Sequence, residues 1–371
     1  IMKLENYEVH LPSYSIGDKI YEKIGPVCES YGKKVLVIGG RKALAAAYDK
    51  IAAYVAQTNL EIIGTEIYGE NCTYATVERL RALPLYQEAD MVFGVGGGKA
   101  LDTVKCLCIP DDKPVFSFPT IASNCAATTS VSILYNEDGT FLKPHFFIRP
   151  VMHAFIDTQI IARAPSQYMW AGIGDTYAKY YEALISSRDE RLEHFTAVGV
   201  AVSQMCRDPL LLYSAQALED HKRGLCTYAV EQVVLAIVVT TGIASIFLTK
   251  DYTPDYNSGL AHAIFYATTA YCADSPVLVE LACENATIRM EEQEVSITWA
   301  DGSKERHSLT SKPVAGGKAY WGNSHGLCIQ DFYRCVREGK PFRNDIAGIA
   351  DTAELMLSMY QSAREHTVVE L

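Results

Sequence analysis

The chain has 371 residues, of which 49% are hydrophobic and 21% are charged, so it can bury the cores of two or more domains and is not a disordered or low-complexity protein. Its formal net charge of −11 argues against a protein that binds nucleic acid or an anionic membrane through bulk electrostatics. The 11 cysteines are odd in number, and the N-terminus lacks a signal-peptide pattern, so we expect reduced thiols and a cytoplasmic protein.

Strand-like and helix-like runs alternate over residues 1–150. Residues 33–40 are a short β-branched run that ends in glycines, and a helical stretch follows over 41–57. The next expected elements are a strand within 61–69, a helix over about 74–83, a strand, glycine turn and helix within 89–109, and a strand within 113–122. This order predicts a parallel sheet with helices on both faces, whose ligand binds beyond the carboxyl ends of the strands.

Long apolar-periodic runs with few strand signals occupy residues 165–270, which predicts a helical domain. Within it, the run over 233–248 is apolar enough to raise the question of a membrane span. The run is shorter than the ~20 residues that a span needs and contains Gly242. We therefore expect a buried core helix and no membrane partner.

The character of the sequence changes again near residue 273. Residues 286–290 and 294–299 are predicted strands, and Asp301-Gly302 is a tight-turn signal after the second of them. Two further helices are expected, one ending at Gly339 and the other containing Ile346 and Tyr360.

A glycine turn, Gly96-Gly97-Gly98, follows a predicted strand and opens a predicted helix. Such a turn brings backbone N–H groups and a helix N-terminus to one point, which suits a pyrophosphate. It lacks the third glycine of the dinucleotide fingerprint, because Lys99 stands there, and it is not a P-loop. Taken alone, the turn fits a purely structural role as well.

Four segments in this order resemble glycerol dehydrogenases and the wider iron-containing alcohol dehydrogenase family: GVGGGKALDTVK, FPTIASNCAATTSVSILYNEDGTF, AGIGDTYAKYYEA and NSGLAHAIFYATTA. The resemblance covers about residues 1–272. It implies a dinucleotide-binding domain over 1–160 and a helical metal and substrate domain over 161–272. A metal and the substrate alcohol would meet in a cleft between these domains.

The same resemblance assigns the nucleotide contacts. They fall on Gly39, Gly40, Gly96, Gly97, Gly98, Lys99, Asp102, Thr120, Ser123, Ser132 and Tyr135. The three hydroxyl residues among them equally fit turn caps and strand edges. We expect NAD as the cofactor. NADP stays open, because Arg41 and Lys42 stand near the place where an acidic residue would hold the ribose 2′-hydroxyl. These two side chains fit a 2′-phosphate or solvated cations equally well.

Asp175 and His262 match two of the family's three protein metal ligands, and we expect them to be catalytic. A divalent cation with an open position, expected to be zinc, would hold the substrate hydroxyl and stabilise the alkoxide during hydride transfer. Taken singly, Asp175 also fits a helix cap and His262 a core histidine. Glu280, not a histidine, stands near the expected third ligand, and Cys125 replaces an aspartate near the substrate. The metal site is therefore expected to be incomplete.

Residues 275–371 resemble the C-terminal end of Gfo/Idh/MocA-type oxidoreductases, through VLVELACENATIRMEEQEVSITWADG and GKAYWGNSHGLCIQDFYRCVREGKPFRNDIAGIADTAELMLSMYQSAR. This implies a third domain over 273–371 that consists of an antiparallel sheet with terminal helices. His325 stands where that family usually has a histidine. The chain is thus expected to be chimeric, with a truncated helical domain.

The expected fold class is α/β, with an N-terminal parallel-sheet nucleotide-binding domain, a truncated all-helical metal domain and a C-terminal α+β segment with antiparallel strands. The expected function is metal-assisted hydride transfer between a small secondary alcohol or a polyol such as glycerol and a nicotinamide cofactor. We expect a homo-oligomer without nucleic-acid partners. The alternatives are a catalytically impaired, chimeric nucleotide-binding protein and a sugar-phosphate dehydrogenase of the same fold.

Overall fold

The computed structural model of the chain describes residues 7–188, 190–249, 278–282, 286–291, 294–299 and 301–308, and the single positions 252, 256, 334, 335, 337, 338 and 340. The chain divides into two compact units, Ile1–Tyr266 and Ala267–Leu371. The three-domain division expected from the sequence stays a prediction.

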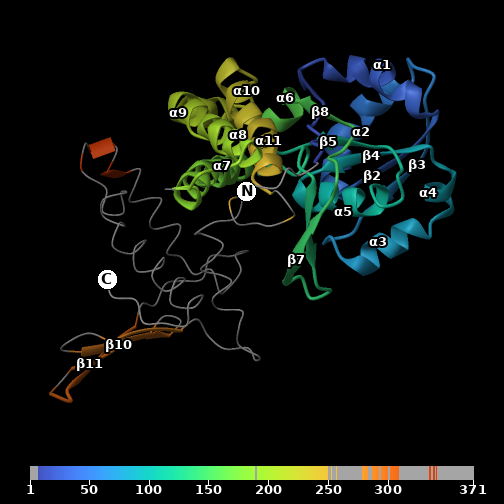
Figure 1. Cartoon of the computed structure of the whole chain (residues 1–371). Helices are drawn as coiled ribbons and strands as arrows, with labels where there is room; N and C mark the ends of the chain where they lie inside the picture. The colour runs from blue at the N-terminus through green and yellow to red at the C-terminus, as the bar shows by residue number, and fades with distance from the viewer. Residues whose placement is uncertain are drawn as a thin grey trace. The chain divides into compact units, whose positions relative to one another are not determined.

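A six-stranded parallel sheet with the order β1-β8-β5-β4-β2-β3 forms the centre of the first unit (Figure 1). Its strands are β1 (Tyr14–Gly17), β2 (Lys34–Gly39), β3 (Glu61–Ile67), β4 (Met91–Gly96), β5 (Val115–Pro119) and β8 (His153–Asp157). All neighbouring strands pair in parallel. The predicted α/β fold with a parallel sheet is confirmed, although the sequence did not indicate β1 or β8.

Helices cover both faces of this sheet. They are α1 (Ile24–Cys28), α2 (Arg41–Val55), α3 (Tyr74–Arg81), α4 (Pro84–Glu88), α5 (Gly98–Cys108) and α6 (Thr158–Ala162). Successive side chains of a strand point to opposite faces. Val35 and Val37 of β2 therefore join the buried cluster of α1 and α2, whereas Leu36 and Ile38 join that of α3, α4 and α5. Burial on both faces explains why β2 is a continuous apolar run.

A hairpin stands beside the sheet. It consists of β6 (Val131–Tyr135) and β7 (Phe141–Phe146), which pair antiparallel. Asn136 and Thr140 close the turn, since Asn136 N donates to Thr140 O over 2.9 Å. The hairpin was not predicted, although Asp138-Gly139 between apolar runs is a hairpin signal.

A helical part follows α6 in the first unit (Figure 1). Its elements are α7 (Ser166–Ser186), α8 (His194–Ser203), η3 (Gln204–Cys206), α9 (Asp208–Lys222), α10 (Tyr228–Val234), the π-helical segment η4 (Leu235–Thr240) and α11 (Thr241–Phe247). One buried cluster joins these helices to the sheet through Leu101 of α5, Ile156 of β8 and Val233 of α10. The predicted helical region is confirmed over its described residues.

The apolar run of this part is a core helix. Residues Tyr228–Phe247 are continuous in helical structure and, by length and composition, long enough to cross a membrane. However, 67% of the apolar window is buried within the fold, and Ile237 and Val238 are fully buried. The prediction of a buried core helix is confirmed.

The described part of the second unit contains a four-stranded antiparallel sheet with the order β12-β11-β10-β9. Its strands are β9 (Leu278–Ala282), β10 (Ala286–Glu291), β11 (Glu294–Trp299) and β12 (Lys304–Ser308). At the predicted turn, Gly302 N donates to Trp299 O and Ser303 N donates to Asp301 Oδ1. The predicted antiparallel strands are confirmed. His325 and most of the two expected helices lie outside the described residues.

His153 joins β8 to the N-terminal strand. Its Nδ1 lies 2.7 Å from Ser13 Oγ and its Nε2 lies 2.9 Å from Ser15 Oγ. The imidazole is buried, and this burial lowers the pKa of His153 from 6.5 to about 4. Charging this ring therefore disfavours the folded state.

Acid is expected to destabilise the first unit through His153. Because the pKa is lower in the folded chain, the contribution is complete above about pH 6.5 and is lost as the pH falls through about 4. A shift of this size corresponds to about 3 kcal/mol. In His153→Gln, the free energy of unfolding, measured with urea, should fall less between pH 7 and pH 4 than in the wild type. Replacing the exposed His194 by Gln is the control, and an equal acid dependence in all three proteins would contradict the assignment.

Candidate functional site

A cavity of about 1040 Å³ lies at the carboxyl ends of the parallel strands. Gly40 follows β2, Gly96 ends β4, Thr120 follows β5, and all three line the cavity. The loop after β3 contributes residues 68–70. This is the edge of an open parallel sheet at which ligands normally bind.

The glycine turn between β4 and α5 forms the floor of this cavity. Gly96 has a φ of 153°, and a Cβ at this position would lie 2.8 Å from Ala100 Cβ, so only glycine lets the chain enter α5 so sharply. Thr120 N donates to Gly96 O over 3.1 Å and fixes the turn to the end of β5. The first turn of α5 thereby faces the cavity with its backbone.

Two helices begin at the cavity, and neither has a side chain that caps its first turn. The N-cap residues are Gly97 in α5 and Gly40 in α2, and neither first turn contains an acidic residue. By contrast, Asp157 caps α6, accepting from the backbone of Gln159 and Ile160, and Thr73 caps α3. The N-termini of α2 and α5 thus present backbone donors and the positive ends of their dipoles to an anion.

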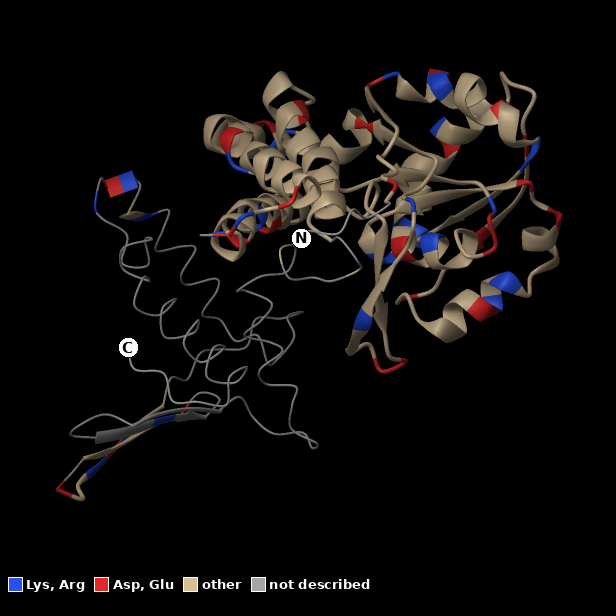
Figure 2. Cartoon of the chain, in the orientation of Figure 1, with Lys and Arg blue, Asp and Glu red and all other residues tan. Residues whose placement is uncertain are grey.

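The charges of the lining also favour an anion. Four cationic side chains line the cavity, Arg41, Lys42, Lys99 and Arg163, against the two carboxylates of Glu70 and Asp102. This excess is local, since the chain has a net charge of −11 and both signs are interspersed on the helices of the first unit (Figure 2). The cavity therefore suits a ligand with two or more negative charges.

Neighbouring side chains hold Lys99 at the cavity. Its Nζ donates to Asn71 Oδ1 over 2.5 Å and lies 5.1 Å from the centre of the Tyr135 ring. Asn71 belongs to the loop after β3, and Tyr135 ends β6. Lys99 thus connects the glycine turn to two other walls of the cavity.

Most residues that the sequence assigned to nucleotide binding line this cavity. They are Gly40, Gly96, Gly97, Gly98, Lys99, Asp102, Thr120, Ser123 and Tyr135. Gly39 and Ser132 are not among its lining residues, and their assignment as nucleotide contacts stays a prediction. A Cβ at Gly39 would lie 2.6 Å from Val95 O, and the buried Ser132 Oγ donates to Asp102 O over 3.1 Å.

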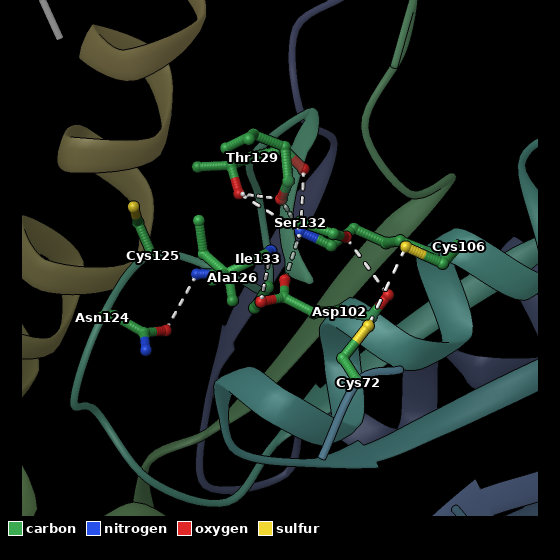
Figure 3. Close-up of polar contacts among 12 residues, drawn as sticks. Cys72, Asp102, Cys106, Asn124, Cys125, Ala126, Thr129, Ser132 and Ile133 are labelled. Carbon is green, nitrogen blue, oxygen red and sulfur yellow. Dashed lines mark hydrogen bonds and ion pairs between the residues drawn. The ribbon is translucent and has the colours of Figure 1, made fainter. Parts of the chain in front are cut away.

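Asp102 forms a buried ion pair behind the cavity lining. Its carboxylate lies 3.0 Å from the Nζ of the fully buried Lys105 and accepts from Ile133 N over 3.1 Å (Figure 3). Lys105 Nζ also donates to Thr129 Oγ1 and to Val131 O. Burial raises the pKa of Asp102, while Lys105 and the Ile133 amide act to lower it. The pair anchors the hairpin on α5.

Sequence reasoning did not predict several residues that line the cavity, because they lie on elements far along the chain from the glycine turn. Tyr68 and Glu70 follow β3, Arg163 follows α6, and Tyr168 lies on α7. The one available signal was the position of Glu70 just after a predicted strand, where nucleotide-binding sheets place polar residues.

The metal prediction rests on residues that the structure describes only in part. Asp175 is exposed on α7, and His262 lies outside the described residues. Burial raises the pKa of Cys125 to about 12, and the nearby Asp175 carboxylate raises this pKa further. The two positions that the sequence places near the metal and the substrate therefore interact electrostatically. Within the described ranges, no three His, Cys, Asp or Glu side chains cluster as a metal site would require. The assignment of Asp175 and His262 as metal ligands therefore stays a prediction.

Sequence comparison relates much of the chain to known proteins. Residues 12–154 match the family of iron-containing alcohol dehydrogenases. Hydroxycarboxylate dehydrogenase A of Escherichia coli K12 is 36% identical over 207 residues, which are 56% of this chain and 56% of that protein. A glycerol dehydrogenase of Pseudomonas putida is 29% identical over 308 residues, covering 78% of this chain and 80% of that protein.

Comparison with solved structures also finds similarity to glycerol dehydrogenases. The crystal structure of glycerol dehydrogenase from Schizosaccharomyces pombe superposes with a TM-score of 0.61 and 27% identity, over 73% of this chain and 68% of that chain. The match covers only about half the length of some curated relatives, 56% of the Escherichia coli protein and 50% of a Thermotoga maritima glycerol dehydrogenase. Residues 12–154 are therefore similar to the iron-containing alcohol dehydrogenase family, and the similarity to glycerol dehydrogenases extends over most of the chain.

Proposed function

We propose that the protein is an oxidoreductase that transfers a hydride between a small secondary alcohol or polyol and NAD(H). The observation that carries this proposal is the cavity of about 1040 Å³ at the strand ends, into which two uncapped helix N-termini open. Its size and its excess of cationic side chains suit a dinucleotide with a pyrophosphate. The bound nicotinamide would supply the chemistry by accepting or returning the hydride.

Different residues of the cavity are proposed to bind different parts of the dinucleotide. Backbone N–H groups at the start of α5 and the Lys99 ammonium are proposed to bind the pyrophosphate. Thr120 and Ser123 are proposed to contact the adenine and ribose side, and Tyr135 lies on the wall assigned to the nicotinamide. These roles follow the family resemblance and are supported by the positions of all four side chains on the cavity.

Asp175 and His262 are proposed to hold a divalent cation, zinc, beside the substrate. The cation would stabilise the alkoxide, which is the chemistry that a side-chain base alone supplies poorly. Cys125 is proposed to change the substrate preference relative to glycerol dehydrogenases, because a half-buried, protonated thiol accepts hydrogen bonds weakly.

A second candidate is a nucleotide-binding protein with impaired catalysis. It is supported by the sequence, in which Glu280 and not a histidine stands near the expected third metal ligand. The proposed Gfo/Idh/MocA-like segment over 273–371 is supported by the four-stranded antiparallel sheet and would replace helices of the truncated domain. A reducing, cytoplasmic location and a homo-oligomeric state are also proposed; the eight described cysteines are all free.

The test is NADH production by the full chain with glycerol, butanediol or a 2-hydroxy acid, before and after addition of zinc. We expect weak activity that rises with zinc and falls at least about 100-fold in Asp175→Ala and in His262→Ala, since losing a direct ligand costs more than the ~10 to 100-fold of an outer partner. His325→Ala should leave activity intact. Binding of NADH without turnover under all these conditions would favour the second candidate, and absence of binding would contradict both.

Cofactor preference gives a further prediction. Arg41 and Lys42 line the cavity at the start of α2, and Glu70 lines it after β3. We expect tighter binding of NADH than of NADPH, because Glu70 can accept a hydrogen bond from the ribose hydroxyl and repel a 2′-phosphate. Titration calorimetry should show this difference shrink in Glu70→Gln. If NADPH binds more tightly and Arg41→Ala removes the difference, the preference is reversed and Arg41 causes it.

A further inference from the structure

Two buried thiols face each other behind the cavity. Cys72 lies in the loop between β3 and α3, Cys106 lies on α5, and their Sγ atoms are 3.9 Å apart (Figure 3). Within the described part of the chain, no other thiol lies in hydrogen-bond contact with a second thiol. The proposed dehydrogenase function uses neither side chain.

We propose that Cys72 and Cys106 are a modification site, at which a peroxide oxidises the two thiols to a reversible disulfide. The Cys106 thiolate attacks the O–O bond of hydrogen peroxide and becomes a sulfenic acid, while the leaving hydroxide takes a proton to form water. The Cys72 sulfur then attacks the sulfenic sulfur, an S–S bond forms, and a second water leaves. Two thiols lose two electrons and two protons, and one peroxide becomes two waters.

The two sulfur atoms lie only a small movement away from bonding distance. A disulfide requires a sulfur separation of about 2.05 Å, so the two atoms must approach by about 2 Å. Cys106 belongs to a regular helix, whereas Cys72 belongs to a loop. Rotation of both side chains and a shift of the loop are therefore the expected adjustment.

The two thiols differ in their reactivity toward the peroxide. The Cys72 thiol donates to Cys106 Sγ, and this hydrogen bond lowers the pKa of Cys106 and raises the pKa of Cys72. Cys106 is 8% exposed, whereas Cys72 is fully buried. Cys106 is thus the thiol that reacts first, and Cys72 is the resolving thiol.

The disulfide would act on the wall of the cavity. Asn71, adjacent to Cys72, accepts from Lys99 Nζ, and Cys72 O accepts from Tyr135 N over 2.9 Å. Drawing Cys72 toward α5 must therefore move the contacts that hold Lys99 and Tyr135. We expect oxidation to weaken dinucleotide binding at least about fivefold, the lower end of usual coupling between two sites. This coupling rests on the proposed function; the disulfide does not.

The experiment treats the full chain carrying Cys226→Ser, which removes an exposed thiol, with hydrogen peroxide. Mass spectrometry of the unreduced digest should show peptides joined through Cys72 and Cys106, which dithiothreitol separates. In Cys72→Ser, dimedone should label Cys106 as a stable sulfenic acid. Cys108→Ala, which removes a buried thiol of the same helix, should leave the cross-link intact. Oxidation of other cysteines without this cross-link would overturn the proposal.

Titration with NADH tests the coupling of the disulfide to the cavity separately from the proposed dehydrogenase function. The oxidised protein should bind NADH at least about fivefold more weakly than the reduced protein, with recovery after dithiothreitol and no change in Cys106→Ser. Equal affinities of the oxidised and reduced forms would overturn the coupling to the cavity. If the reduced protein does not bind NADH, the proposed function fails, and the peptide mapping still decides whether the disulfide forms.

Discussion

Replacing Gly97 by valine is expected to weaken NADH binding at least about 100-fold. Gly97 is the N-cap of α5, and a Cβ at this position would lie 2.5 Å from Ile121 Cδ1, on the cavity wall. The branched side chain would displace Ile121 and keep a phosphate from the backbone donors. Each charge-assisted hydrogen bond contributes about 1.5–3 kcal/mol, so losing two is enough for this decrease. Titration calorimetry measures it.

A matched variant separates this effect from a general loss of structure. Gly174 lies on α7, and a Cβ there would have no atom within 4 Å, so Gly174→Val should bind NADH as the wild type does. Lys99→Gln keeps the backbone and removes one cation, and it should weaken binding about tenfold at low salt and less at high salt. Wild-type affinity in both Gly97→Val and Lys99→Gln would rule out the glycine turn as the phosphate site.

The sequence predicted the strands whose burial leaves a strong pattern, and besides the hairpin it missed two strands, β1 and β8, that pair with each other across the chain. β2 and β4 are apolar on both faces and end in glycines, so their runs are unmistakable. β1 is four residues long and only partly buried, and it becomes a strand by pairing with residues 154–157 of β8. β8 begins with His153 and ends with the helix cap Asp157. Neither strand has a local signal that reveals a partner about 140 residues away.

The residues of the candidate site also divide into those with a local sequence signal and those without one. The glycine turn is a local feature, and its residues line the cavity as expected from the sequence. Arg163 and Tyr168 reach the cavity only because α6 and the start of α7 lie across from it. The spacing of Asp102 and Lys105 is that of an ion pair on one helix turn, which the sequence contains. Their burial, which makes the pair important, depends on the hairpin that packs over it.

Replacing Asp102 by asparagine is expected to lower the free energy of unfolding by about 3–5 kcal/mol, the usual cost of removing one partner of a buried ion pair. Lys105 is fully buried, and its Nζ lies 3.0 Å from the Asp102 carboxylate. The oxygens of Thr129 and Val131 would remain as acceptors but cannot neutralise the ammonium. Urea unfolding followed by circular dichroism measures the loss.

The controls for this prediction also decide between two roles of Asp102. Glu88→Gln, which breaks the exposed ion pair with Lys34, should cost far less, because solvent screens that pair. Adding Lys105→Met to Asp102→Asn should recover stability, since the unpaired buried charge is then gone. A small effect of Asp102→Asn on unfolding, together with a large loss of NADH affinity, would instead support the direct nucleotide contact that the sequence predicts. The internal ion pair predicts the reverse: a less stable protein whose folded fraction binds NADH with nearly unchanged affinity.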